Sequence, residues 1–256
     1  MRYAKGTHSI SPDRDIPLLL QLRNSRFITH QQLFRFMWPL SESNRRSFNW
    51  RIRRLTEAGY ISVCDGISGR GNLVYRITRQ GLLELESHGQ FATVLNSRTQ
   101  HLPHPSHALH ALALNSVQLA LLQNNLLVSW QSDVEIASAN TVSRDPMAKD
   151  YDAIVDVWNN DTAARFGLEY ERTLKSVQQY ARIRRVLEEE NTLTCILYLA
   201  AGEQIALHLA YELSGIPKRL AFATVTAFKD HLLDTMVMTH PNDPQVPFRE
   251  LLHGMF

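Results

Sequence analysis

Three carboxylates in the second half of the chain have the residue types and the spacing of ligands for a metal ion. Asp152 begins a strand predicted over 151–160, and Glu169 and Glu171 lie two residues apart on a strand predicted over 164–173. Side chains at positions i and i+2 of a strand share one face, so both glutamates point the same way. In a partly buried site they would repel each other, and a hard divalent cation, Mg²⁺ or Mn²⁺, would remove that repulsion.

A second interpretation of the same strand stays open. The strand could be a sheet edge whose glutamates face water, with the neighbouring Arg172 pairing with one of them. The place of Asp152 at a strand start, together with the order of the predicted elements, favours the metal site. Lys175, expected at the start of the next helix, is close enough in sequence to reach the same end of the sheet.

The chemistry that suits these residues is cleavage of a phosphodiester bond. A cation held by the three carboxylates would polarise the phosphate and lower the pKa of a bound water. Lys175 completes the candidate catalytic group. Gln178 and Arg182 follow Lys175 at helical spacing and are candidate contacts to phosphate, although plain solvation of a helix face would explain them as well.

The elements around these residues predict a mixed sheet with helices on its faces. Runs rich in β-branched or aromatic residues indicate strands, and apolar residues at helical spacing indicate helices. In chain order, the second half is predicted to contain a helix over 107–125, strands over 126–137, 151–160 and 164–173, a helix over 174–190, a strand over 193–200, a helix over 203–213 and a strand over 219–228.

The first half predicts three helices followed by a hairpin, which is the order of a winged helix-turn-helix. Thr29 and Gln32 form a capping-box pattern at the start of the second helix. Phe48, Ile52 and Leu55 fall at helical spacing on the third helix and predict its buried stripe. The predicted ranges are 13–23, 28–38 and 41–58 for the three helices, 60–78 for the hairpin and 79–88 for a closing helix.

Charge separates the two halves and points to a polyanion as the partner of the first. Residues 1–100 carry 15 Lys and Arg against 7 Asp and Glu, a balance of +8, whereas residues 101–256 have a balance of −6. Arginines concentrate on the third helix, where they can clamp phosphates and reach the base edges of duplex DNA. The alternative is a solvated face on a module that binds protein. The candidate DNA-binding residues are Arg45, Arg46, Asn49, Arg51, Arg53 and Arg54, with Arg70 at the tip of the hairpin.

Composition excludes several other classes of protein. Hydrophobic residues make up 44% of the chain and charged residues 20%, as in a soluble globular protein. Two cysteines are too few for a disulfide framework or a thiolate zinc site. No apolar run is long enough for a membrane span and the N-terminus lacks a signal-peptide core, so we expect a cytoplasmic protein. A segment with two prolines and four histidines separates two predicted domains, 1–100 and 101–256.

The second half resembles the core of the PD-(D/E)xK nuclease superfamily, the fold of restriction endonucleases. In that superfamily an acidic residue at a strand start and an acid-x-Lys pair on the next strand bind Mg²⁺ and activate water. Here the first motif reads Asp150-Tyr151-Asp152, with tyrosine where proline is usual. The second reads Glu169-Tyr170-Glu171, with glutamate where lysine is usual.

The resemblance implies roles for residues outside these two motifs. Some members of the superfamily use E-x-E, and Lys175 would then stand in for the missing lysine. An acidic residue is often found before the first motif, and Asp133 or Glu135 could fill that place.

The whole layout, over roughly residues 15–230, more closely resembles the MOB-C class of plasmid-mobilisation relaxases and the related replication-relaxation family of mobile elements. The sharpest stretches are HALHALALNSVQLAL, KDYDAIVDV and GLEYERTLKSVQQYARIRR. The resemblance implies a two-domain α+β protein that makes a site-specific nick at a transfer origin with a divalent metal. It implies double-stranded DNA as the partner, with single-stranded DNA and accessory mobilisation or coupling proteins as further partners.

Two other functions remain open at the level of sequence. One is a DNA-binding transcriptional regulator whose nuclease-like domain is degenerate. The other is a transposase-associated or restriction-type endonuclease that makes double-strand breaks, which the form of the DNA product would reveal.

Overall fold

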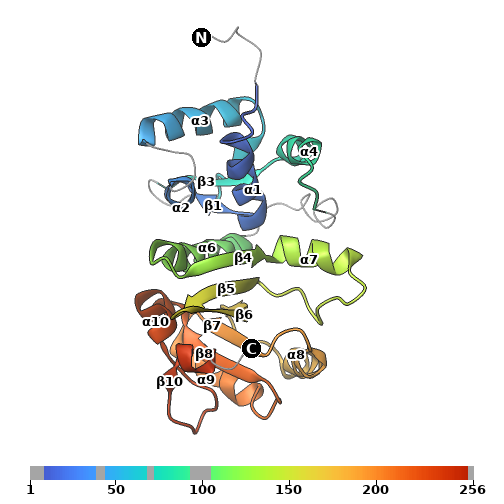
Figure 1. The fold of residues 1–256 in the computed structure, drawn as a ribbon, viewed down its shortest axis with the longest axis vertical. Coiled ribbons are helices and arrows are strands. Elements are labelled where there is room, and N and C mark those ends of the chain that lie inside the picture. Colours follow the sequence, from blue (N-terminus) through green and yellow to red (C-terminus); the bar gives the residue numbers. More distant parts are fainter. Residues whose placement is uncertain (1–8, 39–43, 68–71, 93–104, 253–256) are drawn as a thin grey trace. The chain divides into compact units, whose positions relative to one another are not determined.

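The described residues of the computed structural model are 9–38, 44–67, 72–92 and 105–252 (Figure 1). They form a mixed α+β protein with ten α-helices and a mixed five-stranded sheet. The chain divides into two compact units. Unit 1 consists of residues 1–92 and 97–115, and unit 2 consists of residues 93–96 and 116–256. None of the described helices is both long and apolar enough to cross a bilayer.

Unit 1 combines helices with a small antiparallel sheet of order β1-β3-β2. The predicted sequence of three helices, a hairpin and a closing helix is present, and the two-residue strand β1 adds a third strand by pairing Ile28 with Tyr75. Its elements are α1 (Asp15–Ser25), β1 (Ile28–Thr29), α2 (His30–Met37), α3 (Arg45–Glu57), β2 (Ile61–Val63), β3 (Val74–Ile77) and α4 (Arg79–Ser87).

Local sequence signals in unit 1 act as predicted. The Thr29 side chain caps α2 and Gln32 completes the capping box. The stripe of Phe48, Ile52 and Leu55 on α3 is buried, with at most 3% of each residue exposed. Hydrophobic burial of this face therefore leaves the opposite face of α3 to solvent.

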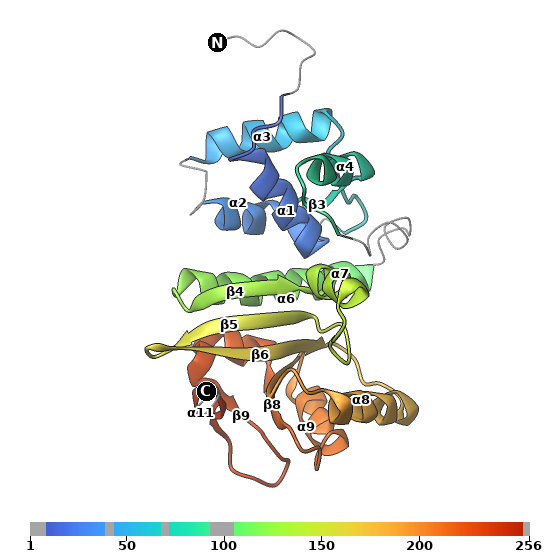
Figure 2. The ribbon, with the colours of Figure 1, turned by 45° about the vertical axis from the view of Figure 1, so that its right-hand side comes forward.

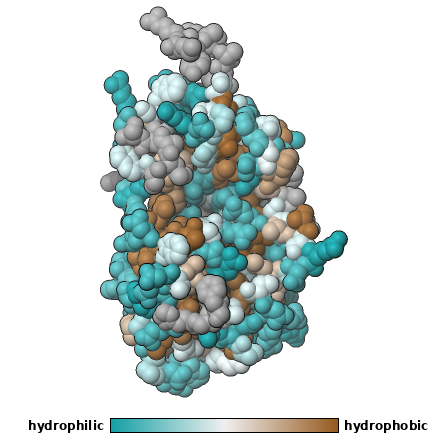
Figure 3. Space-filling model, viewed as in Figure 1, coloured by the Kyte–Doolittle hydropathy of each residue, from teal (hydrophilic) through white to brown (hydrophobic). Residues whose placement is uncertain are grey.

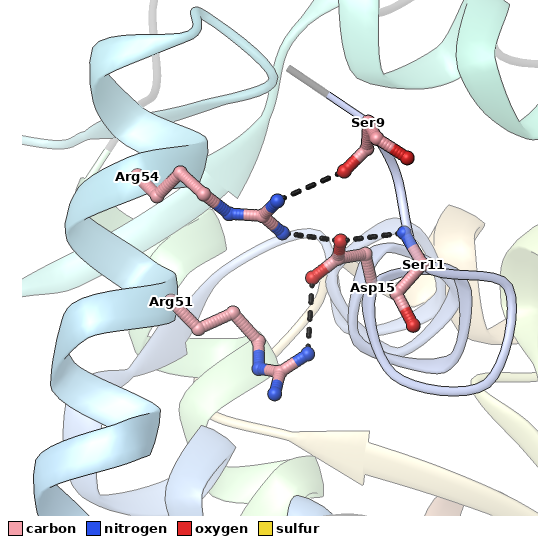
Figure 4. Close-up of polar contacts among 5 residues, drawn as sticks. All are labelled: Ser9, Ser11, Asp15, Arg51 and Arg54. Atoms are coloured by element: carbon pink, nitrogen blue, oxygen red, sulfur yellow. Dashed lines mark hydrogen bonds and ion pairs between the residues drawn. The ribbon is translucent and has the colours of Figure 1, made fainter. Parts of the chain in front are cut away.

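A buried carboxylate joins α1 to α3 (Figure 4). Asp15 is fully buried; its Oδ1 accepts a hydrogen bond from Arg51 Nη1 at 3.1 Å, and its Oδ2 accepts from the Ser11 backbone N–H at 2.8 Å. Arg54 also pairs with Asp15 Oδ2, and its Nη1 donates to the Ser9 carbonyl at 2.9 Å. Two of the arginines on α3 thus have structural partners within unit 1.

Unit 2 is built on the five-stranded sheet of order β4-β5-β6-β7-β8 (Figure 2). The ladder from β4 to β6 is antiparallel, and the ladder from β6 to β8 is parallel. The elements are α6 (Pro105–Gln123), whose first part belongs to unit 1, then β4 (Leu127–Ser132), α7 (Asp133–Val142), β5 (Ala153–Asn159), β6 (Thr162–Glu171), α8 (Val177–Glu189), β7 (Cys195–Ala200), α9 (Glu203–Glu212), β8 (Arg219–Thr224), α10 (Val225–His231), a 3₁₀ turn (Leu232–Asp234), β9 (Met236–Val237), β10 (Val246–Pro247) and α11 (Phe248–Leu251).

Both faces of the large sheet are covered. On one face, side chains of β7 and β8 form a core with α8 and α9 that includes Tyr180, Tyr198 and Leu209. On the other face, Phe166 of β6 packs edge-to-face against Phe248 of α11 at a centroid distance of 5.0 Å. Aromatic packing on both sides makes the end of this sheet a rigid support for the residues that follow its strands.

Two predicted strands end earlier than the sequence indicates, because a capping residue begins a helix. The strand predicted over 126–137 ends at Ser132, whose hydroxyl caps α7 in a capping box with Glu135. The strand predicted over 219–228 ends at Thr224, which caps α10. In both segments the apolar and β-branched residues fit either structure, and the cap decides.

Loss of the buried Asp15 carboxylate should destabilise unit 1. Replacing the residue by alanine in Asp15→Ala removes the carboxylate that pairs with the buried guanidinium of Arg51, so we expect the free energy of unfolding to fall by about 3 kcal/mol. Hydrogen exchange of α1 and α3 in the full chain measures this destabilisation. Glu57→Ala, which breaks the exposed ion pair with Arg53, should leave that exchange nearly unchanged.

Candidate functional site

The hairpin of β5 and β6 brings Asp152 and Glu169 together. Ala153 pairs with Leu168, so Asp152 directly precedes and Glu169 directly follows one rung of the antiparallel ladder. Asp152 Oδ2 accepts a hydrogen bond from the backbone N–H of Tyr170 at 2.7 Å. In addition to burial, the nearby negative charge of Asp152 raises the pKa of Glu169.

Glu169 is the most constrained carboxylate of this group. Only 7% of the residue is exposed, and its Oε2 lies 2.8 Å from Lys149 Nζ. Its Oε1 is buried and has no hydrogen-bond partner within the part of the chain that the structure describes. Burial raises the pKa of Glu169, Lys149 opposes that shift, and Asp152 adds to it. The charged form of this side chain therefore depends on nearby cations.

Glu171 and Lys175 form a second ion pair beside the first. Burial lowers the pKa of Lys175, Glu169 and Asp152 oppose that shift, and Lys149 adds to it. Lys175 thus lies close to Glu169 and Asp152, at the end of the sheet that the sequence indicates. It does not lie in α8, however, because Ser176 caps that helix and places Lys175 in the preceding loop.

Lys149 is a member of this cluster that sequence reasoning missed. Its loop is held by Glu190, which is fully buried and whose Oε2 accepts hydrogen bonds from the Ala148 N–H at 3.1 Å and from the Tyr151 hydroxyl at 3.2 Å. Although burial disfavours the charged form of Glu190, hydrogen bonds from Thr192, Ala148 and Tyr151 lower its pKa. A lysine three residues before Asp152, in the stretch K-D-Y-D, is the one sequence signal that could have identified it.

Tyr198 of β7 lies on the strand next to Glu169 and is paired with it in register. The residue is 1% exposed, its ring stacks on Phe222 at a centroid distance of 5.6 Å, and its hydroxyl has no hydrogen-bond partner among the described residues. Burial raises its pKa, and the charge of Glu169 adds to that shift. Tyr198 therefore packs as a core residue of the sheet.

The arginines predicted to bind DNA fall into two groups in the structure. Arg51 and Arg54 are ion-paired to Asp15, and Arg51 is buried. Arg70 lies outside the described residues. Four candidates on α3 are exposed: Arg45, Arg46, Asn49 and Arg53.

The exposed face of α3 has a few internal contacts. Asn49 Oδ1 lies 2.9 Å from His30 Nε2, and the Arg53 Nε donates to Glu57 at 2.7 Å. Arg45 stacks over the ring of Phe34 at 5.3 Å. On the face shown in Figure 3, hydrophilic residues (teal) are widespread, and hydrophobic residues (brown) lie between them.

The remaining predicted residues are placed as follows. Gln178 and Arg182 are both exposed on α8. Asp133 and Glu135 lie in the first turn of α7, where the Glu135 carboxylate accepts from the Ser132 N–H at 2.9 Å and so serves the helix cap. Across the described ranges, no three or more His, Cys, Asp and Glu side chains are grouped so that they could hold a metal ion by themselves.

Fold and site define a two-unit α+β protein with a partly buried cluster of carboxylates and lysines at the end of a mixed sheet. Residues 19–194, more than half of the chain, match the family described as replication-relaxation, so the chain belongs to the replication-relaxation family. The matched range contains both α3 and the carboxylate cluster. The family connects the chain with replication or mobilisation and implies an interaction with DNA. No curated protein and no solved structure matches the chain.

The burial of Glu169 predicts a pH-dependent stability. Because its pKa in the folded state lies above the ordinary value of 4.5, the folded chain holds a proton that the unfolded chain releases, and stability falls as pH rises through that window. Glu169→Gln removes this titration. Denaturation by urea in EDTA should therefore show the variant gaining stability relative to the wild type as the pH rises from about 5 to about 8, which lies above the ordinary pKa of a glutamate.

The control for this comparison is Glu188→Gln, which changes an exposed glutamate of α8. If the stability difference between Glu169→Gln and wild type were the same at both pH values, Glu169 would not be the source of the pH dependence.

Proposed function

We propose that this protein is a metal-dependent, site-specific DNA-nicking relaxase that acts at the transfer origin of a plasmid or mobile element. The observation that carries the proposal is the pair of buried Glu169 and half-buried Asp152 in a chain of the replication-relaxation family, with one Glu169 oxygen that has no partner among the described residues. Relaxation of DNA requires that one phosphodiester bond be opened, and this cluster is the part of the described structure whose chemistry suits that step.

The residues present fit a hard divalent cation, Mg²⁺ or Mn²⁺. Mg²⁺ usually takes one or two protein carboxylates and completes its coordination with water and substrate phosphate, so a full protein cage is not needed. Asp152 and Glu169 would hold the cation, and the buried Glu169 Oε1 is the oxygen available for it. Such a cation would supply positive charge at the phosphate and lower the pKa of a nearby water.

The second ion pair supplies the remaining functional groups. Glu171 holds the Lys175 ammonium group, and burial lowers the pKa of Lys175 toward the range in which an amine exchanges protons. We assign to Lys175 Nζ the protonation of the leaving oxygen and to Glu171 the orientation of Lys175 and of water. Gln178 and Arg182, exposed on the helix that follows, are assigned to the phosphate backbone.

The order of the elements in unit 2 supports a PD-(D/E)xK-like core. A helix, three antiparallel strands, a helix and a parallel strand follow one another as α6, β4, β5, β6, α8 and β7, with α7 inserted. Asp152 directly precedes the residues of β5 that pair with β6, and Glu169 directly follows the residues of β6 that pair with β5. That superfamily places its acidic motifs at the same positions. The chain still departs from the usual motifs of that superfamily at Tyr151, where proline is usual, and at Glu171, where lysine is usual.

Unit 1 is assigned as a winged helix-turn-helix that reads duplex DNA with α3. The exposed residues Arg45, Arg46, Asn49 and Arg53 are the proposed contacts. We leave Arg51 and Arg54 out of this surface, because their guanidinium groups stabilise the buried Asp15 carboxylate. Arginine contacts to phosphate and guanine edges are the most common in such complexes.

A second candidate function is a DNA-binding regulator in which the acidic cluster is structural. The observation that favours it is that Glu169 and Glu171 each have a lysine partner within the chain. The two functions differ in whether supercoiled DNA is cut, and a nicked circle or a linear product further separates a relaxase from a restriction-type enzyme.

Cleavage should require the carboxylate pair. In Mg²⁺ or Mn²⁺, the wild-type chain should convert supercoiled plasmid carrying its transfer origin into nicked circle, whereas Asp152→Ala and Glu169→Ala should lose at least about 100-fold in rate, the magnitude typical of a lost charge-stabilising group. DNA affinity should change little. Glu188→Ala, on the exposed surface of α8, is the matched control. Equal nicking by all four proteins would disprove the assignment of the site.

DNA affinity should depend on the exposed arginines of α3. The double variant Arg45→Ala/Arg46→Ala should bind duplex DNA more weakly and lower the salt slope of log K by about 1 for each phosphate that an arginine no longer neutralises. Fluorescence anisotropy at several salt concentrations measures both. Arg79→Ala removes an exposed arginine of the same unit outside α3. If that single change affected binding as strongly per charge, general attraction rather than α3 would be responsible.

A further inference from the structure

We propose that Lys149 is a positioning residue that holds one oxygen of Glu169 and thereby orients the other oxygen toward a divalent cation. The inference rests on the proposed metal-dependent function and adds a residue that neither the E-x-E motif nor the acidic strand start contains. It is drawn from the unequal surroundings of the two Glu169 oxygens.

The two oxygens of Glu169 have different partners. Oε2 is 2.8 Å from Lys149 Nζ, whereas Oε1 is buried and has no hydrogen-bond partner in the described part of the chain. The ion pair with Lys149 therefore fixes the carboxylate from the Oε2 side. The other oxygen is left available to a cation.

Lys149 is itself held in place from two sides. Its ammonium lies over the ring of Tyr151 at 5.3 Å from the centroid. The preceding residue, Ala148, and the Tyr151 hydroxyl both donate to the same oxygen of buried Glu190. A lysine on an anchored loop can orient a carboxylate, because little freedom remains to be lost when the contact forms.

Lys175 does not perform the same task. It is ion-paired with Glu171, which lies two residues after Glu169 on the same face of β6. Lys149 could instead compete with a cation for Glu169, which is the opposite of what we propose. The two roles differ in sign, since removing a positioning residue weakens cation binding and removing a competitor strengthens it.

The test is the affinity of the full chain for Mn²⁺, measured from the electron paramagnetic resonance signal of free Mn²⁺. Removing a group that orients a ligand typically costs about 10- to 100-fold in metal affinity, so we expect Lys149→Met to bind Mn²⁺ at least about tenfold more weakly. Lys149→Arg should recover part of the affinity because it retains the charge. Lys229→Met, at an exposed lysine of α10, should bind as the wild type does.

Each outcome decides the matter. Unchanged or tighter Mn²⁺ binding by a folded Lys149→Met chain overturns the proposal, and metal-free thermal denaturation reports whether the variant folds. If it does not, Lys149→Gln retains a hydrogen-bond donor without the charge and should show the same weakening. A wild-type chain that binds Mn²⁺ but leaves DNA intact would refute the proposed reaction alone, and one that binds no Mn²⁺ would refute both.

Discussion

The burial of Glu169 beside Asp152 is the constraint on which the arrangement of unit 2 depends. Two carboxylates at the end of a hairpin repel each other, and burial makes the charged state of Glu169 more costly. The chain offsets this with two lysines that come from different sides of the hairpin, one in the loop before β5 and one in the loop after β6. Glu190 then fixes the first of these loops through Ala148 and Tyr151. The site is therefore an electrostatic assembly of several segments rather than a single motif.

The same physics divides the arginines of α3 into two roles. A buried Asp15 requires cations within unit 1, and Arg51 and Arg54 meet that requirement. Helical geometry then leaves Arg45, Arg46, Asn49 and Arg53 on the exposed face, opposite the buried stripe. A count of arginines on a helix thus overestimates the surface available to a polyanion, because some of the charge is used to join two helices.

Part of this arrangement was predictable from the sequence, namely the features that depend on local pattern. The Thr29 capping box, the buried stripe of α3, the strand start after Asp152 and the shared face of Glu169 and Glu171 follow from short-range spacing. The strands that end at Ser132 and Thr224 were predicted too long, because the apolar residues after each cap fit a strand as well as a helix. The roles of Lys149 and Asp15 could not be predicted, because each depends on a partner that only the tertiary fold brings near.

The division of charge along the chain gives the two halves complementary tasks in the proposed reaction. Residues 101–256 have a balance of −6, so their surface repels phosphate on average, while residues 1–100 have a balance of +8 and attract it. Covalent linkage to a basic unit raises the local concentration of DNA at an acidic site that would otherwise meet it rarely. A divalent cation at Asp152 and Glu169 would offset the repulsion only at the point of reaction. Selectivity would then come from the basic unit, and cleavage would be confined to DNA that this unit has already bound.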